Sequence, residues 1–185
     1  MPEINTENPI HNIVQQKDPV LRKKAKNVPL TMIGTPELAK IIADMSIAMA
    51  TQKDGVAIAA PQIGVSLQIF LVSGEVLSKA DKDYTGDKSD LVFINPKITK
   101  LSKEKHLVEE GCLSVRWLYG TVNRSIKASI VAVNEKGEKI ERGASGLLAQ
   151  IFQHETDHLN GTLFIDKADE VWEMTEEEIA QAQGK

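Results

Sequence analysis

The sequence has one cysteine, few aromatic residues and no long hydrophobic run. The single cysteine, Cys112, excludes a disulfide within the chain and is typical of a reducing compartment. No stretch approaches the roughly 20 apolar residues of a membrane-spanning helix, and residues 1–8 lack the basic start and apolar core of a signal peptide. We therefore expect a cytoplasmic protein without a membrane partner.

Positive charge is not in excess either. The net charge of −4 gives no general electrostatic reason to bind nucleic acid or an anionic membrane, so we expect no direct sequence-specific contact with nucleic acid. With 185 residues, 42% of them hydrophobic, the chain suits one domain with a sizeable core. We expect this single domain to span residues 1–185, with a short acidic tail from about residue 167.

Two histidines stand four residues apart in His154-Glu155-Thr156-Asp157-His158. On a helix both imidazoles lie on one face and can bind one metal ion, while Glu155 can reach a water on that ion. A chance match is common for so short a pattern, but two of only four histidines are used here, and Asn160-Gly161 is a typical helix end. An apolar stripe also predicts that this helix is buried; its members are Leu147, Leu148, Ile151, Phe152 and Leu159.

Cys112 is a candidate third ligand. A lone cysteine is most often a small buried hydrophobe, but Glu109-Glu110-Gly111 before Cys112 does not fit an ordinary apolar strand and predicts a turn that enters a short extended segment. A thiolate is a strong ligand for divalent transition metals, and two histidines with one cysteine leave a fourth position open for water. The sequence therefore predicts a catalytic metal site.

Other segments have recognisable patterns. Residues 36–52 are predicted to form an amphipathic helix that begins at Thr35-Pro36. The small-residue run 55–64 predicts a loop whose backbone approaches something closely. The remaining predictions are strands at 67–72 and 91–94, an exposed loop at 78–90, a hairpin of 126–133 with 138–142, and a capping box at Thr175 that begins a short C-terminal helix.

Three blocks of the chain resemble the three motifs of the peptide deformylase family, in order and in rough spacing. The family patterns are G-x-G-L-A-A-x-Q, E-G-C-L-S and Q-H-E-x-D-H. The blocks that resemble them are Gly55-Val56-Ala57-Ile58-Ala59-Ala60-Pro61-Gln62, Glu110-Gly111-Cys112-Leu113-Ser114 and Gln153-His154-Glu155-Thr156-Asp157-His158. The resemblance covers roughly residues 10–167. It implies a hydrolase that removes the formyl group from the N-terminal formyl-methionine of newly synthesised polypeptides.

With the elements above, we expect an α+β fold, with antiparallel and mixed β-sheets packed around a central metal-binding helix and an additional amphipathic helix.

The resemblance also implies roles for single residues. Cys112, His154 and His158 would hold the metal, Glu155 would transfer protons, and Gln62 with the backbone N–H of Leu113 would bind the developing oxyanion. The apolar pocket for methionine would be formed by Val56, Leu147, Ile151 and the stem of Glu110, with Gly111 letting the substrate backbone come near. Plain core packing is the alternative for the three apolar residues.

Two departures from the family pattern concern the first block. Ala57 stands where the family usually has glycine, and Ile58 stands where it usually has leucine. The Cβ of Ala57 is harmless at negative φ but obstructs substrate docking if this position needs positive φ. Residues 115–120 are unusually aromatic and would flank the substrate cleft; we expect Trp117 to pack against the core and leave the role of Tyr119 open.

One divalent metal ion is the expected cofactor. The resemblance implies Fe²⁺, whereas zinc binds such ligands more tightly on the Irving–Williams order, so Zn²⁺ or Ni²⁺ can replace it. The expected partners are formyl-methionyl peptides of nascent chains, with the ribosome near the exit tunnel as a further candidate. The short acidic tail does not suit a ribosome-docking C-terminal helix.

Two other functions stay open on the sequence. A zinc peptidase of the H-E-x-x-H type would take a third ligand downstream, for which the candidates are Glu170, Glu173, Glu176, Glu177 and Glu178. A non-catalytic relative would bind N-terminal peptides or the ribosome surface, but the presence of both Glu155 and Gln62 argues for catalysis.

Overall fold

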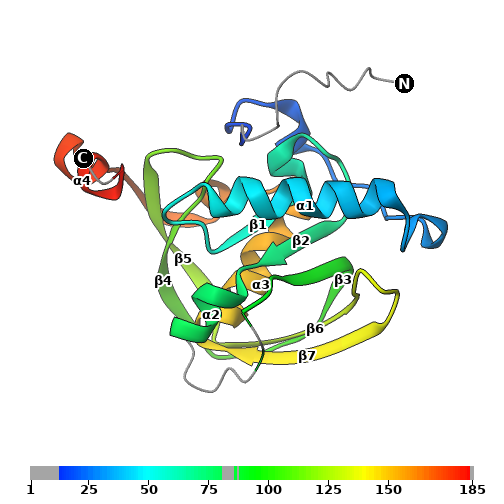
Figure 1. The fold of residues 1–185 in the computed structure, drawn as a ribbon. Helices are drawn as coiled ribbons and strands as arrows, with labels where there is room; N and C mark the ends of the chain where they lie inside the picture. Colours follow the sequence, from blue (N-terminus) through cyan, green and yellow to red (C-terminus); the bar gives the residue numbers. More distant parts are fainter. Residues whose placement is uncertain (1–12, 81–85, 87, 184–185) are drawn as a thin grey trace, which may run out of the picture.

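Two antiparallel sheets and one central helix make up most of the molecule in the computed structural model, which describes residues 13–80, 86 and 88–183 (Figure 1). The five-stranded sheet has the order β1-β2-β3-β6-β7, and the three-stranded sheet has the order β4-β5-β8. The strands are β1 (Ala57–Ala59), β2 (Ile69–Val72), β3 (Leu91–Leu101), β4 (Lys105–Gly111), β5 (Leu118–Ser125), β6 (Lys127–Val133), β7 (Lys139–Ser145) and β8 (Ala168–Glu173). The α-helices are α1 (Pro36–Ala50), α2 (Gly74–Ala80), α3 (Gly146–Leu159) and α4 (Glu176–Gln183).

The predicted α+β class is confirmed. All the strand pairs within the two sheets are antiparallel, and the one parallel pairing among the described residues is the isolated bridge between Lys26 and Leu67. β1 and β4 each lie at a sheet edge, with a partner strand on one side only. In the part of the chain that the structure describes, no helix combines the length and apolar character that crossing a membrane requires.

Helix α3 is the predicted buried helix, and it packs against strands of both sheets. Phe152 lies at its centre, with its ring 6.3 Å from that of Phe70 and 5.3 Å from that of Phe93. Leu148, Ile151, Phe152 and Leu159 are buried as predicted, whereas Leu147 keeps 38% of its surface exposed. Helix α3 ends at Leu159, and Gly161 then adopts a φ of 77°, which favours glycine.

Helix α1 confirms the second predicted helix, although it ends two residues earlier than expected. The side chain of Thr35 accepts a hydrogen bond from the N–H of Leu38 and caps the first turn. Leu38, Met45 and Met49 are buried against β1, β2 and the 3₁₀ helix η3 (Ala60–Ile63). Helix α1 thereby covers part of the five-stranded sheet.

The loop prediction for residues 55–64 is wrong. Residues 57–59 pair with β2, in the register Ala57 with Val72, and η3 follows directly. The run lacks the alternation of apolar and polar residues that is typical of an ordinary strand, because Ile58 and Ala59 are both buried between neighbouring elements. Gly64, at φ 81°, ends η3.

Two other segments also differ from expectation. The predicted loop 78–90 begins inside α2, a seven-residue helix, and its positions 81–85 and 87 lie outside the described residues. The strand predicted at 91–94 continues to Leu101 through Pro96, which the strand tolerates because the pairing shifts register between Ile94 and Lys97.

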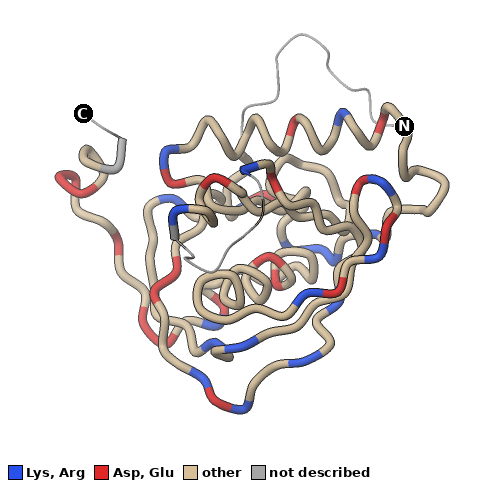
Figure 2. Tube along the Cα trace, turned by 60° about the horizontal axis from the view of Figure 1, so that its bottom comes forward, with Lys and Arg blue, Asp and Glu red and all other residues tan. Residues whose placement is uncertain are grey.

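The hairpin and the C-terminal helix agree with the sequence. β6 and β7 pair along seven residues around a turn at 134–137, where Gly137 has a φ of 83°. The N–H of Glu178 donates to Thr175 Oγ1 and the N–H of Thr175 donates to the Glu178 carboxylate, which is the predicted capping box. Acidic residues follow one another from β8 into α4 at the edge of the molecule (Figure 2).

Candidate metal centre and active-site pocket

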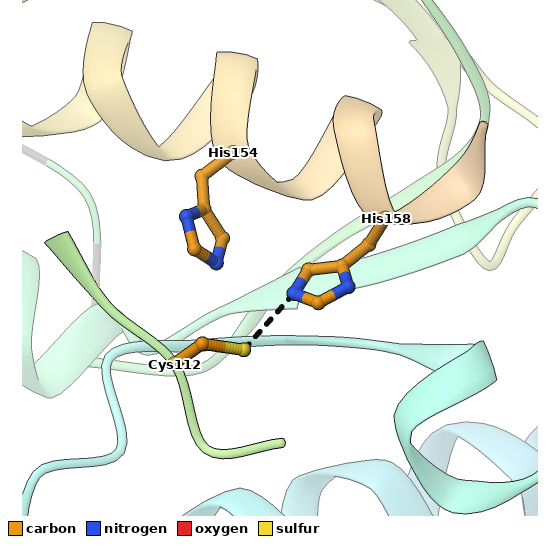
Figure 3. Close-up of side chains that lie close together, drawn as sticks. All are labelled: Cys112, His154 and His158. Atoms are coloured by element: carbon orange, nitrogen blue, oxygen red, sulfur yellow. Dashed lines mark hydrogen bonds between the residues drawn. The ribbon is translucent and has the colours of Figure 1, made fainter. Parts of the chain in front are cut away.

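The side chains of Cys112, His154 and His158 converge on one point (Figure 3). Cys112 follows the end of β4, and both histidines lie on the same face of α3. The three donor atoms lie within 4.8 Å of one another, with 3.2 Å between Cys112 Sγ and His158 Nε2. Donors on one tetrahedral zinc-type ion are separated by about 3.5 Å. The geometry and the soft donor set therefore fit a single divalent transition-metal ion.

A peptidase-type ligand set does not fit. Among the described residues, three His, Cys, Asp or Glu side chains lie close enough together to hold one ion at a single place, formed by Cys112, His154 and His158. The acidic candidates Glu170 and Glu173 lie exposed on β8, and Glu176 to Glu178 lie on α4. The alternative of a third ligand from this acidic region is therefore wrong.

The backbone around Cys112 runs in the opposite order to the predicted one. The extended segment, β4, comes before Cys112, and the turn follows at residues 113–114. The N–H of Ser114 donates to Cys112 Sγ at 3.4 Å, and Gln62 Nε2 donates to it at 3.6 Å. Two N–H donors therefore point at the sulfur of the candidate metal ligand.

A buried chain of charges holds the ring of His154. Its Nδ1 lies 2.9 Å from Glu110 Oε2, which leaves Nε2 for the ion. Arg124 donates to both oxygens of Glu110 at 2.7 and 2.8 Å and to Asp157 at 2.6 Å, and Lys167 bonds the other oxygen of Asp157. The side chains of Glu110 and Arg124 are only 1% and 5% exposed. Glu110 is therefore an anchor for a candidate metal ligand, in addition to the pocket wall that the family resemblance implied for its stem.

These contacts decide the charge of the buried groups. Burial alone would raise the pKa of Glu110, but hydrogen bonds from Arg124 and His154 lower it to about 2. Burial would also lower the pKa of His154, yet its bonds to Cys112 and Glu110 raise it well above the ordinary value. Burial holds the pKa of His158 well below its usual range, so its ring is neutral at pH 7, as a metal ligand must be.

Glu155 is a buried carboxyl group beside this cluster. It is 3% exposed, and its Oε2 has no hydrogen-bond partner among the described residues. Burial raises its pKa to about 7. A carboxyl group with a free oxygen and such a pKa, next to a metal ligand on α3, suits proton transfer at neutral pH.

Gln62 is held in one orientation. Its Oε1 accepts a hydrogen bond from the N–H of Ala59 at 2.8 Å, so that Nε2 points toward Cys112 and Ser114. Gln62 and Leu113 both line the pocket that contains His154 and Glu155. The structure thus brings Gln62 and Leu113 to the candidate metal site from two distant parts of the chain.

The pocket has a volume of about 250 Å³ and lies between the edge strands β1 and β4, beside α3. All the predicted substrate-binding residues line it, namely Val56, Ala57, Glu110, Gly111, Leu147 and Ile151. Ile151 also belongs to the core cluster on which Val56 and Ala57 pack, so packing and pocket formation are not exclusive. Four lining residues were not predicted as substrate-binding: Asp54, Glu109, Tyr119 and Gln150.

The backbone at Ala57 and at Gly111 decides whether a Cβ can be accommodated at each position. Asn95 is the one non-glycine residue with positive φ in the described part of the chain, so Ala57 carries its Cβ without backbone strain. A Cβ on Gly111 would lie 2.7 Å from the ring of Tyr119, its cross-strand partner. Glycine at this position therefore makes room for Tyr119 at the pocket wall, a reason different from the close approach of substrate that the resemblance implied.

Comparisons with known proteins agree with this site. The family model described as polypeptide deformylase matches residues 10–173. A chloroplastic peptide deformylase 1A of Solanum lycopersicum is 39% identical over 163 residues, which are 84% of this chain and 58% of that protein. A peptide deformylase of Pseudothermotoga lettingae is 43% identical over 149 residues, 80% of this chain and 77% of that protein.

Solved structures show the same fold. A class I type b peptide deformylase of Acinetobacter baumannii with Met-Ala-Ser bound has a TM-score of 0.74 and 32% identity, covering 84% of this chain and 97% of that one. The peptide deformylase of Thermotoga maritima has a TM-score of 0.72 and 36% identity, covering 85% of this chain and 97% of that one.

The charge chain leads to a first prediction, for Glu110→Gln. Because the amide carries no charge to orient and polarise His154, metal affinity should fall about 10- to 100-fold. The carboxylate's low pKa stabilises the metal-free fold above about pH 4.5, and this contribution should vanish as the pH falls toward 2. Metal titration, with urea unfolding between pH 2 and 7, measures both effects. Exposed Glu109→Gln is the matched control, and equal metal affinities in the two variants would contradict the anchoring role.

Proposed function

The chain belongs to the polypeptide deformylase family, which removes the formyl group from the N-terminus of newly synthesised polypeptides, and we propose that this chain does so with one divalent ion held by Cys112, His154 and His158. The family assignment made from the three motifs is thereby confirmed, as is its class, a metal-dependent hydrolase of protein synthesis. The observation that carries the proposal is the convergence of these three donors beside a pocket that Cys112, His154, Glu155 and Gln62 line.

The ion would supply Lewis-acid chemistry, which lowers the pKa of a water ligand from its high value in bulk water to about 7. Glu155 would accept a proton from the attacking water and later return it to the departing amine. Burial raises the pKa of Glu155 to about 7 in the metal-free protein, so both of its protonation states are accessible near neutral pH. A cation beside Glu155 favours the ionised carboxylate, so the group can start the reaction as a base.

Two donors stabilise the negative oxygen that develops on the formyl group. We assign this role to Gln62 Nε2 and to the backbone N–H of Leu113. The support is the hydrogen bond from Ala59 to Gln62 Oε1, which orients the amide before substrate arrives. A fixed donor of this kind contributes about 3 kcal/mol to the stability of the transition state.

The peptide has a place between the two free strand edges. β1 and β4 both end their sheets at the pocket, so an extended chain can add to either edge through backbone hydrogen bonds. Val56, Leu147 and Ile151 then form the apolar site for the first side chain, methionine. The Acinetobacter relative binds Met-Ala-Ser, and this supports a peptide that begins with methionine as the ligand of the pocket.

The native metal and the cellular setting are part of the proposal. We propose Fe²⁺, with Zn²⁺ or Ni²⁺ able to occupy the same ligands, and metal analysis of anaerobically purified protein tests it. Nascent chains carry the formyl group as they leave the ribosome, so we place the reaction near the exit tunnel, in the cytoplasm.

The ligand set predicts the effect of Cys112→Ser. Because a hydroxyl is a poor ligand for soft divalent ions, this variant should lose stoichiometric metal binding, as should His154→Ala and His158→Ala. Metal content per chain after dialysis is the measurement, and exposed His106→Ala, which should keep the parent's content, is the control. Full metal occupancy in Cys112→Ser would show that the ligand set is wrong.

Glu155→Gln should keep the metal and the fold but lower kcat about 10²- to 10⁴-fold, because the amide cannot accept a proton. In the parent, kcat/KM should rise with pH as Glu155 ionises, with a midpoint at or below about 7 since the metal favours the anion. Exposed Glu104→Gln is the control for loss of one charge. If Glu155→Gln lost the ion, Glu155 would have a structural role instead.

The apolar pocket predicts substrate preference. Formyl-Met-Ala should react far faster than formyl-Asp-Ala or formyl-Lys-Ala, because burying an unpaired charge costs several kcal/mol. Formyl-norleucine-Ala, uncharged and close to methionine in shape, is the matched control and should react at a similar rate. Acetyl-Met-Ala should be poor, since its methyl group replaces a hydrogen. Efficient cleavage of formyl-Asp-Ala would contradict the assignment of Val56, Leu147 and Ile151.

A further inference from the structure

The backbone after Cys112 carries the proposed oxyanion donor but belongs to no strand or helix. Residues 113–116 form a turn in which the N–H of Val115 donates to the carbonyl of Cys112 at 3.0 Å. The N–H of Leu118 also donates to the carbonyl of Val115 at 3.1 Å, whereas the Leu113 carbonyl and the Arg116 N–H have their partner outside the turn. Oxyanion stabilisation needs donors that are fixed in advance, because a mobile donor must reorganise during the reaction.

Gln15 contacts this turn at two points. Its Nε2 donates to the carbonyl of Leu113 at 3.1 Å, and its Oε1 accepts from the N–H of Arg116 at 3.4 Å. The same Nε2 also bonds the carbonyl of Ile13, which ties the side chain to its own segment. Next to it, the N–H of Val14 donates to the backbone carbonyl of Gln62 at 2.9 Å. One short N-terminal segment therefore holds the backbones of both proposed oxyanion donors.

The side chain of Arg116 ties the other end of the turn across the pocket. Its guanidinium forms a two-point bond with the Asp54 carboxylate at 2.5 and 3.0 Å and bonds Gln52 Oε1 at 2.9 Å. The guanidinium also stacks on Trp117, 4.7 Å from the ring centre. The whole Arg116 side chain is only 18% exposed. Asp54 lies between α1 and β1 and lines the pocket, so this bond joins the two sides of the cleft.

We propose that Gln15 and Arg116 are positioning residues that hold the turn 113–116, and with it the Leu113 N–H, in line with Gln62 Nε2. The inference rests on the proposed function, because it concerns the oxyanion donors of that reaction. Gln15 acts through the carbonyl of Leu113 and the N–H of Arg116, and Arg116 acts through Asp54 and Gln52. Both residues thus act through the geometry of the turn.

The test compares Gln15→Ala and Arg116→Ala with the metal-loaded parent on formyl-Met-Ala. Loss of net hydrogen bonds of this kind should lower kcat about 3- to 10-fold, with KM within about twofold and metal content unchanged. Arg116→Lys should recover part of kcat, because it keeps the charge beside Asp54 but loses the two-point geometry. Amide hydrogen exchange of residues 113–116 should become faster in both alanine variants.

Two matched controls are available in the chain. Gln16→Ala changes the neighbouring glutamine, and Lys40→Ala removes the exposed ion pair with Asp44 on α1; both should keep the parent's kcat and exchange rates. Unchanged kcat and exchange in Gln15→Ala and Arg116→Ala would overturn the inference. A rise in KM at constant kcat would also overturn it, since that result assigns the two residues to substrate binding.

Failure of the proposed function can be told apart from failure of this inference. A metal-loaded parent that cleaves no formyl peptide refutes the function. Hydrogen exchange then decides the inference by itself: faster exchange of residues 113–116 in Gln15→Ala and Arg116→Ala supports the anchoring of the turn, and unchanged exchange overturns it.

Discussion

The buried carboxylate of Glu110 is the interaction on which the rest of the site depends. It joins β4 to His154 on α3 and to Arg124 on β5, and Arg124 continues the link to Asp157 on α3. Taking these charges out of water costs several kcal/mol per ion, and such a group is tolerated only when its bonds are complete. Every charged group in this chain of contacts has at least one partner at short distance, so the three-stranded sheet and α3 are held in one relative position.

The fold places the candidate active-site pocket where two sheets end. β1 and β4 have unpaired edges that face a common pocket, and α3 presents its histidines beside that pocket. Unpaired edges are usually a liability because they attract other strands. In this family the same property suits an enzyme whose proposed substrate is an extended N-terminus. Backbone hydrogen bonds would hold any sequence, while the apolar pocket would select the first side chain.

In the proposed reaction, polar groups that are held by hydrogen bonds have different roles from the one buried group that lacks a partner. His154 and Gln62 are each fixed by a hydrogen bond on the side away from the metal position. Glu155 keeps a buried oxygen without a partner among the described residues, and burial raises its pKa to about 7. Fixed groups suit ligands and oxyanion donors, because their positions must not change. A group whose charge changes in the reaction needs the opposite, an environment in which both protonation states are accessible.

The amino-acid sequence by itself determined the local features. Helical spacing on α3, the stop at Asn160-Gly161, the capping box at Thr175, the hairpin of β6 with β7 and the three family motifs all depend on neighbours within a few residues, so they could be predicted. Tertiary structure alone decided the β1 pairing, the continuation of β3 through Pro96, the charge chain from Glu110 to Lys167, and the contacts of Gln15 with a turn 98 residues away. Only a weak sequence signal could have identified Arg124: it stands two residues after Val122 on β5, so its side chain also points inward. These features join residues that are far apart in the chain, and local propensity holds no information about which distant partner a buried charge or a strand edge will meet.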